Sequence, residues 1–333
     1  MSSFCKFLSF LSGTPYDIFI VTRKDVLAFF QGKPSLHDEF WFSRSDWIAF
    51  VNSMGYPTAI LDFPDNTFVN YEQIKSWLVD QAKGSTIRIG FEATTPYNQV
   101  SKWKKALDGI PIQWEADESL CDSFRIQKSG HEMKLLRRAS DLACAGFWYA
   151  IQYLRPGVTE EQVASKMITF WMEQEPSAKP SFDVMVLFGE NGSSPHRESG
   201  VRRLREGDVV LMDFGVKLDG FCSDMTRTFS FGEPLDEDFL NVWRIVLEAK
   251  SAATALFSKR VSAASFEKKA REVISDAGYG KQFIHSLGHG LGVLVHEMPR
   301  FNKEEPLPID SCVTVEPGIY LPGRFGVRLE DSF

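Results

Sequence analysis

The sequence predicts an α/β domain followed by an α+β domain. Its 333 residues suit two domains, because a domain holds about 150 residues on average. Helix-like and strand-like segments alternate in the first third, which is typical of α/β layers. Farther along, long helical stretches are separated by runs rich in β-branched and aromatic residues, which favours an α+β arrangement. We therefore expect domains over residues 1–125 and 126–333.

The first domain is expected to consist of alternating strands and helices. Apolar runs flanked by turn residues predict the strands DIFIVT (17–22), TAILDF (58–63), TIRIGFE (86–92) and IPIQWEA (110–116). Helices are expected over Phe40–Met54, Tyr71–Ala82 and Pro96–Leu107. None of these segments contains a glycine-rich loop for binding phosphate, so the sequence indicates no nucleotide site in this domain.

Two capping boxes mark the first helices of the second domain. The S-x-x-E pattern at 129–132 opens an amphipathic run to about residue 154, and T-x-x-Q at 159–162 opens a helix to about residue 173. Two further helices are expected over residues 236–257 and 262–277. The runs VVLMDFG, GFCSDMTRTFSF and CVTVEPGIYL are typical of strands and predict a mixed sheet with helices on one side.

The composition of the chain limits which partners it can bind and indicates its cellular compartment. The chain has 44 Asp and Glu against 37 Lys and Arg, a formal charge of -7, which argues against a nucleic-acid partner. The five cysteines form no C-x-x-C pair, and the N-terminus has no apolar stretch long enough for a signal peptide. No window approaches the roughly 20 apolar residues of a membrane helix. We expect a cytoplasmic protein without a membrane partner.

Asp213 and Asp224 are predicted to converge on one hairpin. Asp213 ends an apolar run, Asp224 lies on the next strand, and Asp219-Gly220 marks a turn between them. Closure midway between the two carboxylates would set them directly opposite each other, whereas closure at Asp219-Gly220 would make them diagonal neighbours. Two ionised carboxylates at such a short distance repel each other, so the pair must share a proton or hold a cation.

A second hairpin repeats this arrangement. Glu316 and Glu330 each follow a short run of strand-forming residues, and the midpoint between them falls on Gly323 within the turn-like segment LPGR. One such hairpin is also compatible with a surface ladder of salt bridges. Two hairpins with facing acids, separated by a histidine-rich segment, favour a functional site instead.

The segment between the two hairpins supplies imidazole groups. Of the six histidines, four lie between residues 196 and 296, and 285–297 is apolar apart from His285, Ser286, His289, His296 and Glu297. A lone histidine would be a hydrogen-bonded core residue. Four carboxylates with one imidazole instead form an oxygen-rich donor set suited to divalent manganese, cobalt, iron or zinc. Five ligands suggest two ions at roughly 3.5 to 4 Å, as in two-metal hydrolases.

These segments resemble the pita-bread metallopeptidases, which include methionine aminopeptidase, aminopeptidase P and prolidase. The matching pieces are GSSPH, LMDFGVKLDGFCSDMTRTF, HSLGHGLGVLVHEMPR and VTVEPGIYLPGRFGVRLED. The resemblance implies a creatinase/aminopeptidase-like pita-bread catalytic domain after the α/β domain. It implies that the ligands of two metal ions, with manganese the first choice, are Asp213, Asp224, His289, Glu316 and Glu330. It also places His196, His285 and His296 in the substrate pocket, with Arg328 pointing toward the same site.

The D-x-T-R-T-F and H-E-x-P-R segments look like the Xaa-Pro-specific branch, prolidase and aminopeptidase P. This resemblance implies a peptide substrate with proline at the second position and a homodimer. It makes Glu316 a proton shuttle as well as a ligand, and it makes His196 and His296 donors to the substrate. Prolidases resembling this segment bind the dipeptide's carboxylate through an arginine at the position of Arg300. Dipeptidase and aminopeptidase activity both stay open.

Two alternative functions stay open, and the sequence differs from the family pattern at its C-terminal end. The same fold hosts metal-independent creatinase-like hydrolases that are not peptidases, and binding modules without catalysis; both typically lack the metal ligands. The chain shown ends three residues after Glu330, where related sequences usually continue. Terminal residues fray unless they are tied down, so we expect Glu330 to be weakly held. The alternatives are that neighbouring strands and the metals pin this strand, or that the chain shown lacks native C-terminal residues.

Overall fold

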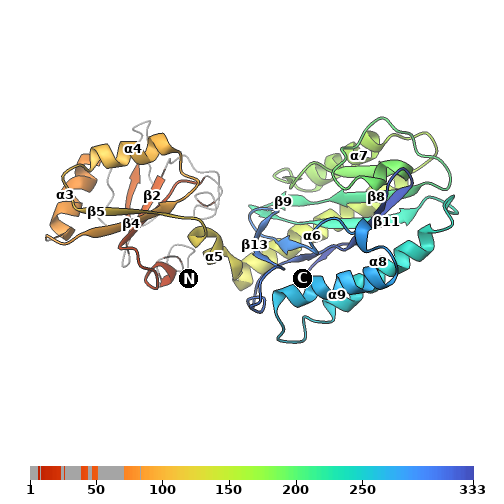
Figure 1. Ribbon diagram of the computed structural model, residues 1–333. Coiled ribbons are helices and arrows are strands. Elements are labelled where there is room, and N and C mark those ends of the chain that lie inside the picture. The colour runs from red at the N-terminus through yellow and green to blue at the C-terminus, as the bar shows by residue number, and fades with distance from the viewer. Residues whose placement is uncertain are drawn as a thin grey trace. The chain divides into compact units, whose positions relative to one another are not determined.

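Figure 1 shows the computed structural model, which describes residues 7, 9–23, 26, 39–43, 47–51, 71–82 and 84–333. The chain divides into two compact units, Met1–Phe124 and Arg125–Phe333. Separate clusters of buried apolar side chains form the cores of the two units. None of the described helices is long and apolar enough to cross a membrane.

The first unit is built on a five-stranded sheet within its described residues. Its elements are β1 (Ile18–Val21), β2 (Glu39–Ser43), β3 (Trp47–Val51), α3 (Tyr71–Ala82), β4 (Ile87–Glu92), α4 (Tyr97–Ala106) and β5 (Ile112–Asp117). The strand order is β3-β2-β1-β4-β5, with β1, β4 and β5 parallel and β2 and β3 antiparallel to their neighbours. All four residues of β1 are buried, as expected at the centre of a sheet.

The structure corrects one predicted helix of this unit. Within Phe40–Met54, the described residues form strands β2 and β3 instead. The sequences EFWFS and WIAFV are dense in aromatic and β-branched residues, which pack better on a pleated sheet than on a helix. The predicted strand at 58–63 lies outside the described residues. The helices predicted over Tyr71–Ala82 and Pro96–Leu107 are confirmed, as are the other three strands.

The long helices of the second unit are α6 (Gly130–Ala150), α7 (Glu160–Gln174), α8 (Phe239–Thr254) and α9 (Ala263–Asp276), preceded by the short α5 (Leu120–Ile126). Both predicted capping boxes are present, with Ser129 capping α6 and Thr159 capping α7. The run predicted to reach residue 154 tightens into a 3-10 turn, η1 (Ile151–Tyr153), after α6 ends. Helices α8 and α9 run side by side (Figure 1).

Short strands make up the remainder of the second unit. They are β6 (Lys179–Pro180), β7 (Met185–Phe188), β8 (Val209–Phe214), β9 (Val216–Leu218), β10 (Phe221–Cys222), β11 (Met225–Ser230), β12 (His289–Gly290), β13 (Glu297–Arg300), β14 (Thr314–Val315), β15 (Gly318–Leu321), β16 (Phe325–Arg328) and β17 (Asp331–Ser332). Every strand pair within residues 125–333 is antiparallel, so the prediction of a mixed sheet is wrong. Strand propensity carries no direction, and the tight turns at Asp219-Gly220 and in LPGR impose antiparallel pairing on the two hairpins.

Two helix pairs hold these strands in place. Helices α6 and α7 pack on β7 and β8, where the Phe147 and Phe214 rings stack with centroids 5.5 Å apart. Helices α8 and α9 pack on β15 and β16, where Phe239 meets Phe325 edge-on at 5.8 Å. Every residue of β8 and β16 is buried. The side chains at the ends of these strands therefore project from a rigid, well-packed layer.

Candidate metal centre

The first hairpin brings Asp213 and Asp224 onto the same face. Strands β8 and β11 pair with Asp213 opposite Thr226, and Asp224 lies two residues before Thr226. Side chains two residues apart on a strand share a face, so the carboxylates are diagonal neighbours. The turn is at Asp219 and Gly220, whose φ angles of 50° and 87° suit a type I′ hairpin. Of the two closures considered, the one at this turn is correct.

The second hairpin brings Glu316 opposite Glu330. Strands β15 and β16 pair Gly318 with Arg328, and β14 and β17 pair Val315 with Asp331 in the same register. The two glutamates lie between these paired segments, which confirms the hairpin centre at the LPGR turn. Glu330 is 1% exposed, and Glu316 is partly exposed.

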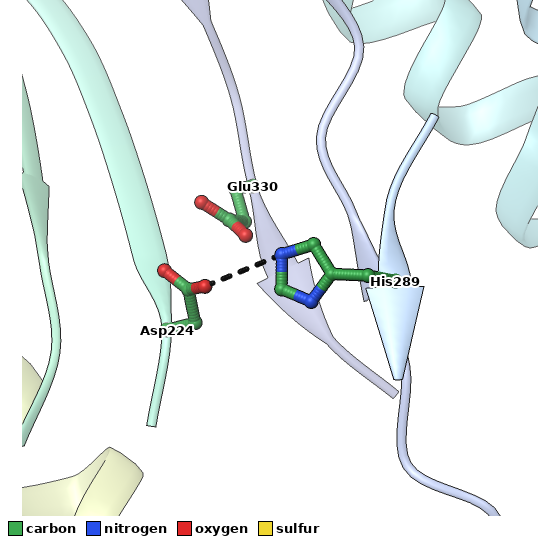
Figure 2. A group of neighbouring side chains, drawn as sticks. All are labelled: Asp224, His289 and Glu330. Atoms are coloured by element: carbon green, nitrogen blue, oxygen red, sulfur yellow. Dashed lines mark ion pairs between the residues drawn. The ribbon is translucent and has the colours of Figure 1, made fainter. Parts of the chain in front are cut away.

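His289 lies between the carboxylates of the two hairpins. Its Nε2 atom is 3.6 Å from Asp224 Oδ2 and 3.3 Å from Glu316 Oε1. Its Nδ1 atom is 3.1 Å from the Gly290 carbonyl oxygen, which can only accept a hydrogen bond. In a neutral imidazole, this contact places the proton on Nδ1 and leaves the Nε2 lone pair facing the acids. Figure 2 shows Asp224, His289 and Glu330, whose potential ligand atoms lie within 4.8 Å of one another.

The carboxylates of this site repel one another electrostatically. Burial, reinforced by the charges of Glu330 and Asp213, raises the pKa of Asp224 well above its ordinary value. Burial and the charges of Glu316 and Asp213 do the same to the pKa of Glu330. Burial also works against ionisation of Glu316, but the contact with His289 outweighs it and lowers the pKa of Glu316. Such repulsion between buried acids is relieved by a bound cation.

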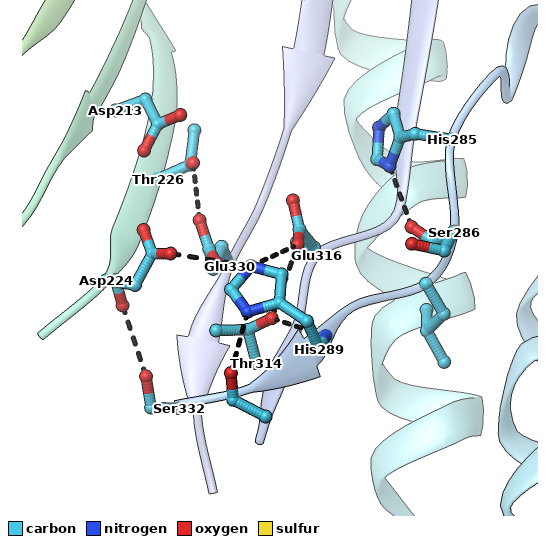
Figure 3. Close-up of polar contacts among 12 residues, drawn as sticks. Asp213, Asp224, Thr226, His285, Ser286, His289, Thr314, Glu316, Glu330 and Ser332 are labelled. Atoms are coloured by element: carbon cyan, nitrogen blue, oxygen red, sulfur yellow. Dashed lines mark hydrogen bonds and ion pairs between the residues drawn. The ribbon is translucent and has the colours of Figure 1, made fainter. Parts of the chain in front are cut away.

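Two buried carboxylate oxygens of this site, Asp213 Oδ1 and Glu330 Oε1, have no hydrogen-bond partner among the described residues. The other oxygen of each acid is bonded. Thr226 Oγ1 donates to Glu330 Oε2 at 2.7 Å (Figure 3), and the Arg328 guanidinium donates to Asp213 Oδ2. Buried acceptors without partners are rare in proteins. Together with the imidazole nitrogen, they form a hard, oxygen-rich donor set. The residues present therefore fit divalent metal ions.

A cavity of about 310 Å³ opens onto these acids. The predicted site residues that line it are Asp213, Asp224, His289, Glu316, Glu330, His196, His285, His296, Arg300 and Arg328. The structure thus gathers every residue that was singled out from the sequence. The cavity also contains apolar side chains that the sequence reasoning missed, among them Phe182, Met185 and Val295. No polar motif marks these positions, and only the folded chain shows that they face the cavity.

The family model for metallopeptidase family M24 matches residues 134–333. The chain belongs to metallopeptidase family M24. It is 38% identical over 236 residues to an uncharacterized peptidase of Staphylococcus aureus (strain bovine RF122 / ET3-1), covering 70% of this chain and 67% of that protein. It resembles the solved prolidase from Pyrococcus horikoshii OT3, with 28% identity, a TM-score of 0.83, and coverage of 99% and 94% of the two chains. It also resembles the X-Pro aminopeptidase from Thermotoga maritima MSB8, with 26% identity, a TM-score of 0.83, and coverage of 100% of this chain and 94% of that chain.

These comparisons decide the fold and the broad activity. The chain is a metallopeptidase, with an N-terminal α/β domain and a pita-bread catalytic domain. The resemblance to the prolidase and aminopeptidase P branch of this fold is confirmed.

In this M24 chain, a buried hydrogen-bond chain joins the acids to His285. The Arg328 side chain is buried; its Nη2 contacts Asp213 and its Nη1 donates to the Tyr320 hydroxyl at 2.7 Å. That hydroxyl lies 2.9 Å from His285 Nε2. Burial raises the pKa of Tyr320 to about 12, so its hydroxyl stays protonated. The sequence reasoning missed Tyr320, because a tyrosine on a buried strand carries no signal that distinguishes it from core filler.

The remaining pocket residues of the M24 site surround His289. The His296 ring lies edge-on to the His289 ring, with centroids 4.2 Å apart. Arg300 is exposed and stands opposite His289 in the β12–β13 pair, and His196 is an exposed residue of the loop after β7. Burial lowers the pKa of both His285 and His296, which favours their neutral forms. Neutral imidazoles can both donate and accept hydrogen bonds.

The residues after Glu330 are firmly held. The Phe333 backbone N–H donates to Val313 O at 2.8 Å, and the Val313 N–H donates to Phe333 O at 3.0 Å. The Asp331 carboxylate binds Arg227 Nη2 at 2.6 Å and also contacts Lys250 Nζ. The expectation that Glu330 is weakly held is therefore wrong, and the alternative that neighbouring strands pin it is correct.

Proposed function

We propose that this metallopeptidase hydrolyses the Xaa-Pro bond at the N-terminus of peptides. The observation that carries the proposal is the convergence of four acids on one imidazole at a cavity that also holds three further histidines and two arginines. The names of the similar solved structures, a prolidase and an X-Pro aminopeptidase, support the choice of bond. A second, metal-free role as a binding module is an outcome of the tests below.

The metal site of this proposal holds two divalent ions. Its ligands are Asp213, Asp224, His289, Glu316 and Glu330. Bound there, divalent ions supply activated water at neutral pH and polarise a carbonyl oxygen. Manganese is the first choice, and cobalt, zinc or iron are alternatives for the same donor set.

The protein's own groups bind the peptide and handle its protons. Glu316 is proposed to take a proton from the attacking water and pass it to the leaving nitrogen, because this partly exposed carboxylate lines the cavity. His196 and His296 donate hydrogen bonds to the substrate around the scissile bond. Arg328 holds Asp213 through its guanidinium and His285 through Tyr320, so that both keep a fixed orientation.

A substrate with proline at the second position requires a pocket that recognises the proline ring. An Xaa-Pro bond lacks the N–H that most peptidases grip, so recognition must come from the shape of the ring. The apolar side chains of Phe182, Met185 and Val295 provide surface for such a ring. Arg300, exposed on the cavity rim, suits the free carboxylate of a dipeptide. This contact would favour dipeptides over longer Xaa-Pro substrates.

Metal content measured together with peptide turnover tests the proposal. We expect two divalent ions per chain and cleavage of an Xaa-Pro dipeptide, an Xaa-Pro-Yaa tripeptide, or both. The ratio of their kcat/KM values decides between dipeptidase and aminopeptidase. Asp213→Ala should abolish turnover, and turnover that survives this change would contradict the two-metal mechanism. A protein with no affinity for any metal would favour the binding module or a creatinase-like hydrolase, whereas metal binding without cleavage of either Xaa-Pro peptide would overturn the proposed activity.

Other features remain proposals from the family resemblance. These are an accessory domain over residues 1–125 beside a catalytic domain over residues 126–333, a homodimer, and a cytoplasmic location. Light scattering coupled to gel filtration tests the dimer, and a mass of about one chain (37.7 kDa) would overturn it.

A further inference from the structure

A buried carboxylate at the start of α7 binds one loop from both sides. Glu160 is fully buried at 0% exposure. Its Oε1 atom accepts hydrogen bonds from the Phe188 backbone N–H at 2.7 Å and from Asn191 Nδ2 at 2.9 Å. Its Oε2 atom accepts from the Gly200 backbone N–H at 3.0 Å. All three donors belong to the segment 188–200, which we call the His196 loop.

The three donors flank the pocket histidine. Phe188 and Asn191 precede His196, and Gly200 follows it. One rigid carboxylate thus binds both arms of the His196 loop and fixes their separation. Backbone hydrogen bonds reinforce the contact, since the Glu160 N–H donates to Arg202 O at 3.2 Å. His196 is held at the apex, where it lines the cavity.

The His196 loop also rests directly on a strand that leads to the metal site. A Cβ atom added to Gly326 would lie 2.0 Å from the Gly192 carbonyl oxygen, so the two backbones are in contact. Gly326 belongs to β16, which continues into Arg328 and Glu330. The loop is therefore fixed between Glu160 on one side and the ligand-bearing strand on the other.

We propose that Glu160 is a positioning residue that sets the location of His196 relative to the metal ligands. Glu160 is not among the residues that line the cavity, so it acts through the loop and not on the substrate. Burying a carboxylate away from water is unfavourable unless its acceptors are satisfied. Here they are satisfied by donors from the His196 loop, and that ties the arrangement of the loop to this side chain. The inference rests on the proposed function only where peptide turnover is measured.

Glu160→Gln is the sharpest variant. Glutamine keeps the shape but replaces one acceptor oxygen with an NH₂ group, which faces an N–H and cannot accept from it. We expect kcat/KM for an Xaa-Pro peptide to fall roughly 10- to 100-fold, as when groups that orient a site are removed. Metal content should not change. Glu161→Gln is the matched control, because Glu161 is the next residue of α7 and its side chain is exposed. It should keep wild-type kinetics.

A double-mutant cycle separates positioning from general stability. In the His196→Ala background, Glu160→Gln should change kcat/KM by less than about 2-fold, because the group it positions is gone. If the two effects multiply instead, Glu160 acts independently of His196 and the proposal is overturned.

Amide hydrogen exchange provides a readout that needs no activity. In Glu160→Gln, amides of the His196 loop should exchange at least about tenfold faster, while those of β8 stay unchanged. Unchanged exchange in the loop would overturn the proposal. If the wild type cleaves no Xaa-Pro peptide, the proposed function fails but this measurement still decides the role of Glu160. If Glu160→Gln does not fold, Asn191→Ala removes a single donor and should accelerate exchange in the same loop; protection equal to wild type would contradict the role of Glu160.

Discussion

Glu316 and Glu330 stand opposite each other at a break between two paired segments that share one antiparallel register. Val315 pairs with Asp331 directly beside them, and the β15–β16 pairs continue the same register on the other side. A slip of one residue would turn both side chains to the opposite face of the hairpin. The two acids therefore depend on every contact that fixes this register, including contacts beyond Glu330.

Asp331→Asn should weaken metal binding without altering a ligand. Burial by itself would raise the pKa of Asp331, but the ion pairs with Lys250 and Arg227 outweigh it and lower that pKa. Losing the charge loosens β17 and hence Glu330. We expect about tenfold weaker Mn²⁺ affinity by isothermal titration calorimetry. Asp276→Asn, an exposed change on α9, is the control. Equal affinities in the two variants would contradict the prediction.

The metal-free protein should lose stability as the pH rises. The raised folded-state pKa values of Asp224 and Glu330 mean that the folded protein binds these protons more tightly than the unfolded chain. Their stabilising contribution is complete below the unfolded carboxyl pKa of about 4, and it disappears as the pH rises through the folded values. Glu316, with a lowered pKa, acts in the opposite direction as a single group.

Urea unfolding in the presence of a chelator measures this dependence. From about pH 5 to 8, we expect the free energy of unfolding to fall without metal. Saturating Mn²⁺ should stabilise the protein more at the upper end, because a cation favours the ionised ligands. A metal-free protein whose stability rises over this interval would refute the prediction.

Arg328→Met should destabilise the metal-free protein strongly. The change leaves the buried Asp213 carboxylate without its cation, and breaking a buried pair in this way costs about 3–5 kcal/mol. Arg324→Met is the matched control from the same hairpin, because Arg324 makes exposed ion pairs with Asp236 and Asp238. Such exposed pairs contribute little to stability. Chemical denaturation compares the two variants, and similar losses would disprove the role given to Arg328.

Tyr320→Phe should lower turnover while metal binding persists. The change removes the hydroxyl that joins Arg328 Nη1 to His285 Nε2. We expect kcat for an Xaa-Pro peptide to fall about tenfold with unchanged metal content, as when a group behind a catalytic residue is lost. Tyr149→Phe removes a hydroxyl bonded to Tyr153, outside the cavity lining, and should have no effect on kcat. Full activity of Tyr320→Phe would show that the connection is dispensable.

The sequence predicts the second unit better than the first for a physical reason. Acids at the ends of apolar strands must find partners when they are buried, so Asp213, Asp224, Glu316 and Glu330 mark their hairpins. Turn residues then fix which side chains face each other, as at Asp219-Gly220. In Phe40–Met54, Ser45 and Asp46 can begin a helix as well as form a turn, so they do not exclude the helical interpretation. Only the pairing of β2 with β1 and β3 reveals the strands.

Supporting residues are harder to predict from sequence. Tyr320 and Glu160 act through hydrogen bonds to groups 35 and 28 to 40 residues away in the chain, and no local pattern encodes those contacts. The apolar side chains of the cavity are of the same residue types as those of the hydrophobic core, so the sequence does not distinguish them. Such positions become visible only when the fold brings distant segments together.

The backbone contact between Gly192 and Gly326 limits how substrate preference can be re-engineered. A methyl group at Gly326 would collide with the Gly192 carbonyl oxygen and with the Tyr320 ring. The spacing between the His196 loop and β16 is consequently set by main-chain thickness. Variants that accommodate bulkier or smaller rings should therefore arise at Phe182, Met185 and Val295, whose side chains line the cavity.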